Sequence, residues 1–545
     1  MSEAIDAHSG GAPTRLFAAF EGGGAKGLVH VGALKALEAR GFEFKAVAGT
    51  SAGAIVAVLK AAGYQADEIV DPVGRRTIFD TYKDITGRPL RPIGLFGSQG
   101  WRKIQLLRVL LGRKSRVAIR IIVALVVLTF CAFFLFQNVR GLHYLSTAVS
   151  VIGIPCFLLL LYLKNRGGIT SLRTCRDALN TLIAAKLFPD DVNRIVVLSD
   201  FRRTGLPSLR IVAADITKRE LRLFSSESDE DASVPVADVV AASVCIPLIF
   251  RPWEIKGRLH VDGGIVSNLP AWPFDEERAL DLDALTLAFE IEDRGSRDVR
   301  ADLQSWMLDV VLTAAFGASL LNKRAVDRLH VFRLGTDLNT LDFDVSLDRS
   351  LDTVKEARAA ADALIARHLI DVPGLYTEGC RRVQSLAASA LASIPNAIVA
   401  APDGGRVRVC VAIAEPGFPK SLRLSYSVGF EDDADEGILL PREGSYIGDA
   451  WNEGVSVLGT PPFDVLPSPG SRRLNKLFAK DIRWILAVPV YRSDSVRREP
   501  DFVIAVDGSH VLKEDDQILD EVLTLLPRVV DEVFAPIATE LAKEG

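Results

Sequence analysis

The sequence predicts an α/β domain followed by a separate α+β domain, and three observations lead to that fold class. Near the N-terminus, at 16–37 and again at 44–62, a short apolar strand runs into a glycine-containing turn and then into a helical pattern. This strand–turn–helix rhythm is typical of a sheet whose chemistry lies at the carboxyl ends of its strands. Two long apolar runs interrupt this domain, and beyond residue 387 strand patterns dominate.

Bulk properties restrict the possible functions. A chain of 545 residues is too long for one ordinary core, so two or three domains are expected. The net charge of -5 gives no reason to expect nucleic-acid binding. The six cysteines form no CxxC pair, which argues against a disulfide framework and a zinc site, and we expect neither a metal nor a cofactor. Residues 1–14 are small and polar and lack the apolar core of a signal peptide, so they are predicted to be a disordered leader.

The first elements follow from apolar spacing. Strands are expected at Leu16–Phe20 and Phe44–Ala48, where short apolar runs precede glycines. Apolar residues recur at helical spacing over Gly27–Arg40, and Gly41 ends that helix. A second helix, rich in small residues, is expected over Ala52–Ala62.

The second turn, Gly49-Thr50-Ser51-Ala52-Gly53, predicts a nucleophile. In a G-x-S-x-G turn the serine sits where a strand passes abruptly into a helix, and side chains at the two glycine positions would collide with neighbouring backbone. Ser51 would then lie at the positive end of the following helix, which favours a developing alkoxide. The alternative is a tight turn that only begins a helix.

The first turn contains Gly22, Gly23, Gly24 and Gly27, and it predicts an oxyanion hole. The backbone N–H groups of Gly23 and Gly24 would face the tetrahedral intermediate, and one such donor typically contributes about 10²–10³ in rate. A phosphate-binding loop is the alternative, because glycine-rich turns before helices also hold phosphates. Lys26 is followed by glycine rather than by Ser or Thr, so the run lacks the magnesium ligand of a nucleotide site.

The general base is predicted to be a carboxylate. His30 lies inside the first helix and is expected to pack there, and His260 precedes the end of a strand. Asp262 ends that strand, in His260-Val261-Asp262-Gly263-Gly264, and could accept the proton of Ser51 directly. Asp215 is an alternative carboxylate, although its position favours a turn or cap residue.

Two apolar runs, 117–136 and 145–163, are each about 20 residues long, which at 1.5 Å per residue spans the roughly 30 Å of a bilayer core. They predict a transmembrane hairpin at 117–163. Basic residues flank both ends of the hairpin, so the positive-inside rule predicts a multi-pass membrane protein with two spans and with its catalytic and C-terminal domains in the cytoplasm. A buried helical pair in a soluble core is the alternative.

A domain boundary is expected between 372 and 387, after a helical pattern at 353–370 that ends before Pro373. The remaining residues, 387–545, are predicted to form an antiparallel sheet with a final amphipathic helix. The expected strands and helix are Val407–Ile413, Leu422–Val428, Trp484–Tyr491, Asp501–Val506 and Asp515–Phe534.

Four segments in order, FEGGGAKG, GTSAG, AASVCIP and HVDGGIVSNLP, resemble the patatin-like phospholipase family. The resemblance runs from about Leu16 to about Ile370 and implies a three-layer hydrolase sheet at 15–372. It also implies a catalytic Ser51–Asp262 dyad and an oxyanion loop formed by Gly22, Gly23, Gly24 and Gly27. Many family members have Arg where this chain has Lys26, and the hairpin at 117–163 is not part of the family core.

The C-terminal region resembles, more weakly, a GAF-type sensory domain. The residues that carry the resemblance lie at 443–451, 483–490 and 502–507. Such domains bind small molecules or pair with partners, so a small-molecule ligand or a dimer partner is possible for 387–545. Ordinary sheet strands joined by a glycine turn are the alternative.

These observations together predict a membrane-anchored lipid acyl hydrolase of the phospholipase or lysophospholipase type. Its expected substrate is a membrane phospholipid or another fatty-acyl ester, and no nucleic-acid partner is expected. Two alternatives remain at this point. One is an acyltransferase or thioesterase that uses the same dyad, and the other is a membrane-tethered sensor whose hydrolase site is vestigial.

Overall fold

The computed structural model describes residues 14–97, 100–102, 104–105, 168–281, 284–294, 329–401, 404–415, 418–430, 433, 435, 437–459, 480–492 and 499–543. The chain divides into two compact units. One comprises 12–363, here called the N-terminal unit. The other comprises 364–545 together with 1–11, and its portion from 364 onward is called the C-terminal unit.

The N-terminal unit is built around a mixed sheet, which confirms the predicted α/β class. Its described residues form eight strands in the order β12-β11-β1-β2-β6-β10-β9, with β7 paired to β6. The strands from β12 to β6 run parallel, whereas β7, β9 and β10 are antiparallel to their neighbours. The strands are β1 (Arg15–Phe20), β2 (Glu43–Thr50), β6 (Ser208–Asp215), β7 (Glu220–Ser225), β9 (Trp253–Ile255), β10 (Arg258–Asp262), β11 (Leu285–Asp293) and β12 (Leu329–Thr336).

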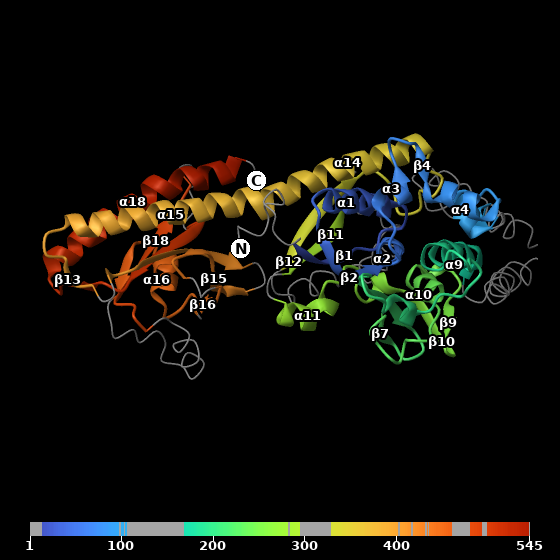
Figure 1. Ribbon diagram of the computed structural model, residues 1–545, viewed down its shortest axis with the longest axis horizontal. Helices are drawn as coiled ribbons and strands as arrows, with labels where there is room; N and C mark the ends of the chain where they lie inside the picture. Colours follow the sequence, from blue (N-terminus) through green and yellow to red (C-terminus); the bar gives the residue numbers. More distant parts are fainter. Residues whose placement is uncertain are drawn as a thin grey trace, which may run out of the picture. The chain divides into compact units, whose positions relative to one another are not determined.

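Both strand–turn–helix units form where the sequence predicts them. Strand β1 leads through the 3₁₀ turn Gly24–Gly27 into α1 (Leu28–Ala39), and β2 leads directly into α2 (Ala52–Ala61). Strand β1 is buried over Leu16–Phe20, as expected for a central strand covered on both faces. Figure 1 shows α1 and α11 (Asp275–Leu280) on opposite sides of these strands.

Strands β2 and β10 lie end to end along one edge of β6. Thr50, the last residue of β2, is opposite Val212, and Asp262, the last residue of β10, is opposite Ala213. The other edge of β6 is occupied by β7 over the same residues. Because β2 and β10 run toward each other, the residue that follows Thr50 is brought next to Asp262.

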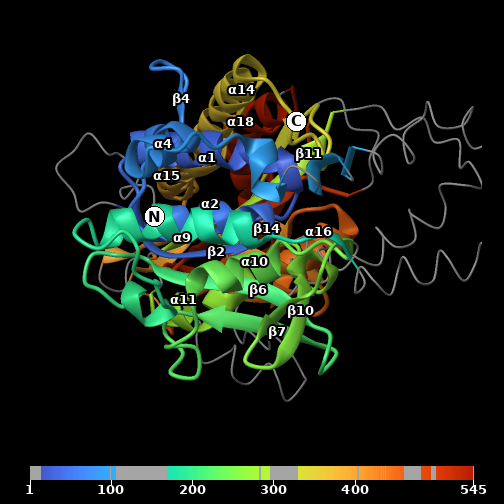
Figure 2. The same cartoon turned by 90° about the vertical axis from the view of Figure 1, so that its right-hand side faces the viewer.

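The other described elements of the N-terminal unit surround this sheet. Helix α10 packs against β6, β9 and β10, and Figure 2 shows it alongside β6. The remaining bounds are α3 (Ala66–Ile69), α4 (Ile78–Thr86), α9 (Arg173–Leu187), α10 (Val236–Ser243), α14 (Leu347–Ala366), and the short pairs β3 (Val70–Asp71) with β4 (Arg76–Thr77) and β5 (Gly168–Thr170) with β8 (Leu248–Phe250).

The C-terminal unit contains an antiparallel sheet in the order β16-β15-β14-β19-β18-β17. The four strands expected from the sequence all form, as β14, β15, β18 and β19. The bounds are β14 (Val407–Glu415), β15 (Phe418–Val428), β16 (Leu439–Pro441), β17 (Val457–Gly459), β18 (Trp484–Val490) and β19 (Phe502–Gly508), with β13 (Ile398–Ala400) pairing β20 (Val511–Leu512).

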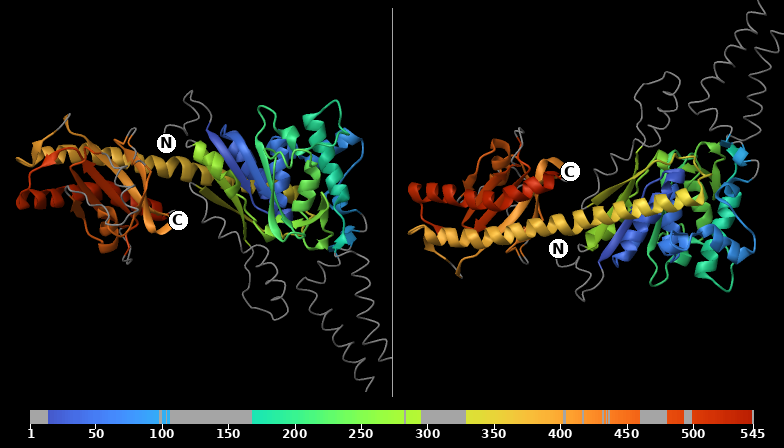
Figure 3. Two further views of the ribbon diagram at one scale, coloured as in Figure 1. Left: turned by 90° about the horizontal axis from the view of Figure 1, so that it is seen from below. Right: turned by 90° about the horizontal axis from the view of Figure 1, so that it is seen from above.

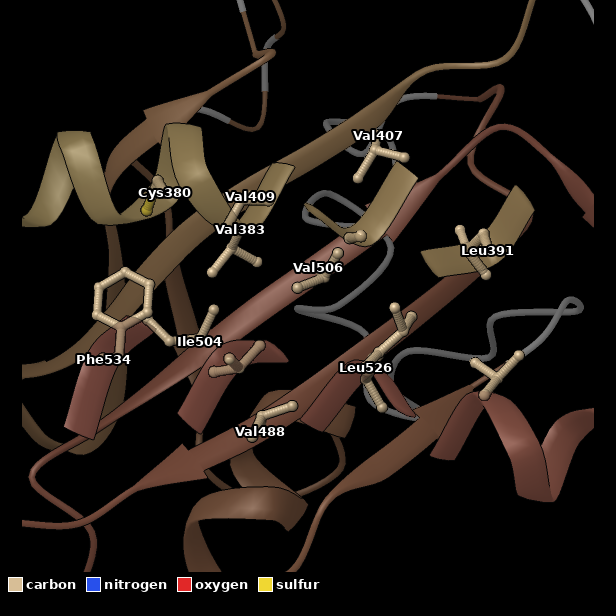
Figure 4. Close-up of a cluster of buried hydrophobic side chains, with 14 of the residues drawn as sticks. Cys380, Val383, Leu391, Val407, Val409, Val488, Ile504, Val506, Leu526 and Phe534 are labelled. Carbon is tan, nitrogen blue, oxygen red and sulfur yellow. The ribbon is translucent and has the colours of Figure 1, made fainter. Parts of the chain in front are cut away.

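Helices cover this sheet on both faces. Helices α15 (Val372–Ser393) and α18 (Asp516–Lys543) lie side by side, as Figure 3 shows. Their apolar side chains interlock with alternate residues of β14, β18 and β19 in the core drawn in Figure 4. Helix α16 (Tyr446–Glu453) packs on the residues of the opposite face.

The helix predicted to end before Pro373 does not end there. A π-helical turn at Arg367–Asp371 follows α14, and α15 begins at once with Pro373 in its first turn. A proline is tolerated in a first turn because its missing N–H has no helical partner there. The side chains of Tyr376, Cys380 and Val383 in α15 pack into the core of the C-terminal unit. The boundary between the two units lies between Ala363 and Leu364, which is N-terminal to the predicted boundary.

The predicted localisation needs correction. Among the described residues, every helix is too short or too polar to span a bilayer. Helix α18 has 28 residues, but it is amphipathic and carries acidic and basic side chains. A multi-pass protein with two spans is therefore not supported. The apolar runs within 117–163, on which that prediction rested, lie outside the described residues.

Candidate active site

Ser51 occupies a strained turn between β2 and α2. Its backbone has φ 52° and ψ -122°, in the positive-φ region that residues with a side chain rarely adopt. A Cβ at Gly49 would overlap the backbone of Gly53, and a Cβ at Gly53 would overlap the carbonyl oxygen of Phe20 in β1. The two glycines of the motif are therefore required by the close approach of helix and strand.

The structure brings Ser51 and Asp262 into contact. The Ser51 hydroxyl donates a hydrogen bond of 2.7 Å to Oδ2 of Asp262. The other carboxylate oxygen, Oδ1, accepts a bond of 2.8 Å from the backbone N–H of Gly264. Ser51 is 5% exposed and Asp262 is 4% exposed, so the pair is shielded from bulk water. Gly263 follows Asp262 because a Cβ there would overlap the carbonyl oxygen of Val212.

The environment makes Asp262 a stronger base than an ordinary aspartate. Burial raises the pKa of Asp262 from 3.8 to about 6, because it disfavours the charged carboxylate. The bonds from Ser51 and Gly264 act in the opposite direction and lower this pKa, but they do not cancel the effect of burial. A base with a pKa near the working pH is suited to accept and return a proton.

This pKa predicts a pH dependence. Only the ionised carboxylate of Asp262 can accept a proton, so kcat/KM of an ester-cleaving reaction should rise as the pH increases through about 6. We expect a loss of about tenfold for each pH unit well below that midpoint. A pH–rate profile between pH 4.5 and 8.5 measures it, and a profile that is flat across pH 5 to 7 would contradict a base with this environment.

Some backbone N–H groups of the glycine loop donate hydrogen bonds within the protein, and others do not. The N–H of Gly22 donates to the carbonyl oxygen of Asn268 (3.1 Å), and the N–H of Ala25 donates to that of Thr340 (3.0 Å). Among the described residues, the N–H groups of Gly23 and Gly24 donate no hydrogen bond. These two amides are the ones left to hold an oxyanion.

The other glycines of the loop have spatial roles. A Cβ on Gly22 would contact the Ser51 side chain at 3.0 Å, and a Cβ on Gly27 would contact that of Ala52 at 2.6 Å. Gly24 has φ 58° and lies against the carbonyl oxygen of Thr340. Lys26 forms an ion pair with Asp293, so the positive charge of Lys26 is neutralised.

The remaining candidates lie in structural positions. His30 is fully buried, and burial lowers its pKa to about 4, so the ring is neutral at pH 7 where its Nε2 meets the carbonyl oxygen of Glu21 (2.8 Å). His260 is also buried, and burial lowers its pKa. Asp215 accepts bonds from the N–H groups of Thr217 (2.8 Å) and Lys218 (2.9 Å), the pattern of a turn residue.

Three residues near the site received no role from the sequence. The hydroxyl of Ser243 accepts a bond from the backbone N–H of Ser51 (2.9 Å). The carboxylate of Glu21 accepts bonds from the side chain of Asn268 (2.9 Å) and from the N–H of Ile291 (2.6 Å), which joins the glycine loop to the segment after Asp262. The sequence feature that could have identified these residues is that each is a polar residue inside a motif of otherwise small or apolar residues.

Metal ligation is not suggested by the described part of the chain. Within it, no three side chains of His, Cys, Asp or Glu are grouped so that they could hold a metal ion. The described cysteines at 175, 245, 380 and 410 are free thiols.

Comparison with known proteins identifies the domain that contains these residues. Residues 18–275 match the family model for patatin-like phospholipase, and this stretch contributes to an α/β fold with a central mixed sheet. A relative from Bacillus subtilis (strain 168), the uncharacterized protein YqhO, is 26% identical over 293 residues, covering 52% of this chain and 74% of YqhO.

Two solved structures are similar to parts of this chain. VipD from Legionella pneumophila is 19% identical, covers 66% of this chain and 67% of its own, and has a TM-score of 0.33. The GAF domain of a two-component sensor histidine kinase from Bacillus halodurans is 15% identical, covers 30% of this chain and 93% of its own, and has a TM-score of 0.20. The GAF-type resemblance of the C-terminal unit stays a prediction.

Proposed function

We propose that the protein is a serine carboxylic-ester hydrolase that cleaves fatty-acyl esters of lipids, with Ser51 as nucleophile and Asp262 as base. The observation that carries this proposal is the 2.7 Å hydrogen bond between two buried side chains 211 positions apart. Both residues lie inside the patatin-like phospholipase domain at 18–275. Phospholipids and lysophospholipids are the substrates that this domain favours.

The first half of the reaction forms an acyl-enzyme. Asp262 accepts the hydroxyl proton of Ser51 while the serine oxygen attacks the acyl carbonyl carbon. The negative charge that develops on the carbonyl oxygen is held by the open N–H groups of Gly23 and Gly24. The tetrahedral intermediate then collapses, the bond to the alcohol oxygen breaks, and the protonated Asp262 returns its proton to that oxygen.

The second half releases the acid. A water molecule gives a proton to Asp262 as its oxygen attacks the carbonyl carbon of the acyl-Ser51 ester. The bond to Ser51 breaks, and the serine oxygen recovers the proton from Asp262. A raised pKa of about 6 suits a carboxylate that gains and loses a proton in each half.

The experiment that tests the nucleophile uses a fluorophosphonate probe. We expect the wild-type protein to be labelled on Ser51 and the Ser51→Ala variant to be unlabelled and inactive on phospholipid and lysophospholipid vesicles. Ser226→Ala is the matched control, because Ser226 is also buried but its hydroxyl accepts a bond from the N–H of Leu209. A folded wild type that takes no label and releases no fatty acid would contradict the proposal. Formation of a fatty-acyl ester of an added alcohol would instead indicate acyl transfer.

For the chain as a whole we propose a hydrolase domain at 15–372 and a GAF-like sensory or dimerisation domain at 387–545. The separate core of the C-terminal unit supports this division. A small-molecule ligand or a second copy of the chain would act there. Mass measurement in solution of the full chain would show a dimer, and a monomer at all concentrations would leave ligand binding as the proposed role.

A further inference from the structure

The end of helix α10 contacts the backbone of both proposed catalytic residues. Ser243, the last residue of α10, is fully buried and accepts a hydrogen bond from the N–H of Ser51 (2.9 Å). Two residues later, the carbonyl oxygen of Cys245 accepts a bond from the N–H of Asp262 (2.9 Å). One short segment therefore holds the nucleophile on one side and the base on the other.

The hydroxyl of Ser243 is itself fixed. It donates a bond of 2.7 Å to the carbonyl oxygen of Val212 in β6. Val212 is opposite Thr50, and the next residue of β6, Ala213, is opposite Asp262. The Ser243 hydroxyl thus links the turn at Ser51 to the strand that also positions Asp262.

The backbone of Ser51 needs such a restraint. Its positive φ is costly for a residue with a side chain, and conformations of this kind persist only where the surroundings enforce them. Without an acceptor at Ser243, the N–H of Ser51 would lack a partner in a buried site, and the turn could relax toward an ordinary conformation. Such a relaxation would move the Ser51 hydroxyl away from Asp262.

We propose that Ser243 is a positioning residue, which sets the separation of the Ser51 hydroxyl from the Asp262 carboxylate without itself touching the substrate. This inference rests on the proposed function, because it assigns Ser243 to the same reaction. It predicts an effect on the chemical step that exceeds any effect on folding. A displacement of about 1 Å at a reacting group can cost about 10²-fold in rate.

Ser226, which follows the last residue of β7, provides a matched comparison beside the same strand β6. It is also fully buried, and its hydroxyl accepts a bond from a backbone N–H of β6, that of Leu209 (3.0 Å). Leu209 pairs with Val47 in β2, three residues before Thr50. Replacing either serine by alanine removes one hydroxyl and leaves one buried N–H without that acceptor, but only Ser243 contacts Ser51.

The experiment compares Ser243→Ala with Ser226→Ala in the full chain. For Ser243→Ala we expect kcat on a lysophospholipid or a short-chain ester to fall about 10- to 100-fold, KM to stay within about threefold, and the fluorophosphonate labelling rate to fall in parallel. The acidic limb of the pH–rate profile should shift to higher pH, because the hydrogen bond from Ser51, which lowers the pKa of Asp262, is weakened. Ser226→Ala should keep all four properties near the wild-type values.

Several outcomes would overturn the positioning role. They are a wild-type kcat in Ser243→Ala, an equal loss of kcat in both variants, a loss confined to KM, or unfolding of Ser243→Ala while Ser226→Ala remains folded. If the wild type is active and labelled but Ser243→Ala matches it, only this inference fails. If the wild type itself is neither active nor labelled, the proposed function fails and the inference fails with it.

Discussion

Replacing Asp262 by asparagine is expected to lower kcat by about 10²–10⁴-fold, the usual contribution of a general base. The amide keeps the size of the side chain and can still accept the bond from the N–H of Gly264, but it cannot take the proton of Ser51. Fluorophosphonate labelling of Ser51 should slow by a similar factor. Steady-state kinetics on a lysophospholipid and labelling rates measure the two effects.

Asp215→Asn is the control for this substitution. Asp215 is another buried carboxylate of the same sheet and was the alternative base in the sequence, yet it accepts turn bonds from Thr217 and Lys218 and makes no described contact with Ser51. An asparagine can accept the same turn bonds, so activity should stay within about threefold of wild type. Strong loss in Asp215→Asn with normal activity in Asp262→Asn would reverse the assignment of the base.

The substitution Asp262→Asn should also stabilise the folded protein at neutral pH. The pKa of Asp262 in the folded protein, about 6, lies above its usual value of 3.8. The folded state therefore binds more protons between about pH 4 and pH 6, and the stability of the wild type falls as the pH rises through that range. Asp262→Asn lacks this penalty, so its melting temperature relative to wild type should increase from pH 4 to pH 7. A constant difference would show that Asp262 is not a buried charge.

Replacing Arg408 by alanine is expected to destabilise the C-terminal unit by about 3–5 kcal/mol, the usual cost of removing one partner of a buried ion pair. Arg408 is 1% exposed, and its guanidinium donates to Asp507 (2.7 and 2.9 Å), Asp435 (2.9 Å) and Asp433 (2.8 Å). The Cζ atom of Arg408 also lies 3.9 Å from the ring centre of Phe430. Without it, the carboxylates of Asp507 and Asp435 would lose the cation that bonds to both of them.

Hydrogen exchange of peptides from β14 and β19 measures this loss without separating the two units, because it reports local unfolding. Arg382→Ala is the control: Arg382 pairs with Glu378 on the surface of α15, with side chains 68% and 56% exposed, and its loss should cost less than about 0.5 kcal/mol. Similar protection in Arg408→Ala and Arg382→Ala would contradict a stabilising role for the buried cluster.

Local patterns in the sequence predicted the elements that carry the proposed site. The apolar runs before Gly22 and Gly49 became β1 and β2, and the helical spacing after each glycine turn became α1 and α2. Alternating apolar residues likewise predicted β14 and β19 of the C-terminal unit. These predictions succeed because strand and helix periodicity are local properties, set by which side chains face the core.

Other predictions failed or remained incomplete because they depended on distant residues. The helix expected to end before Pro373 continues, since the proline falls in the first turn of α15, where no N–H is required. Gly22 was placed in the oxyanion loop, and only the tertiary structure shows that its N–H donates to the carbonyl oxygen of Asn268, far away in the chain. Ser243 had no predicted role because its importance lies in a contact with Ser51, 192 positions earlier.

The sequence by itself determined the chemical groups of this protein: a serine in a turn that only glycines allow, a carboxylate before two glycines, and a glycine-rich loop. The tertiary structure decided which of them meet. Strands β2 and β10 lie end to end along β6, and this arrangement places Ser51 beside Asp262 rather than beside His260 or Asp215. The physical reason is that turn geometry is encoded within a few residues, whereas strand order and burial, which raise the pKa of Asp262, arise from packing of the whole sheet.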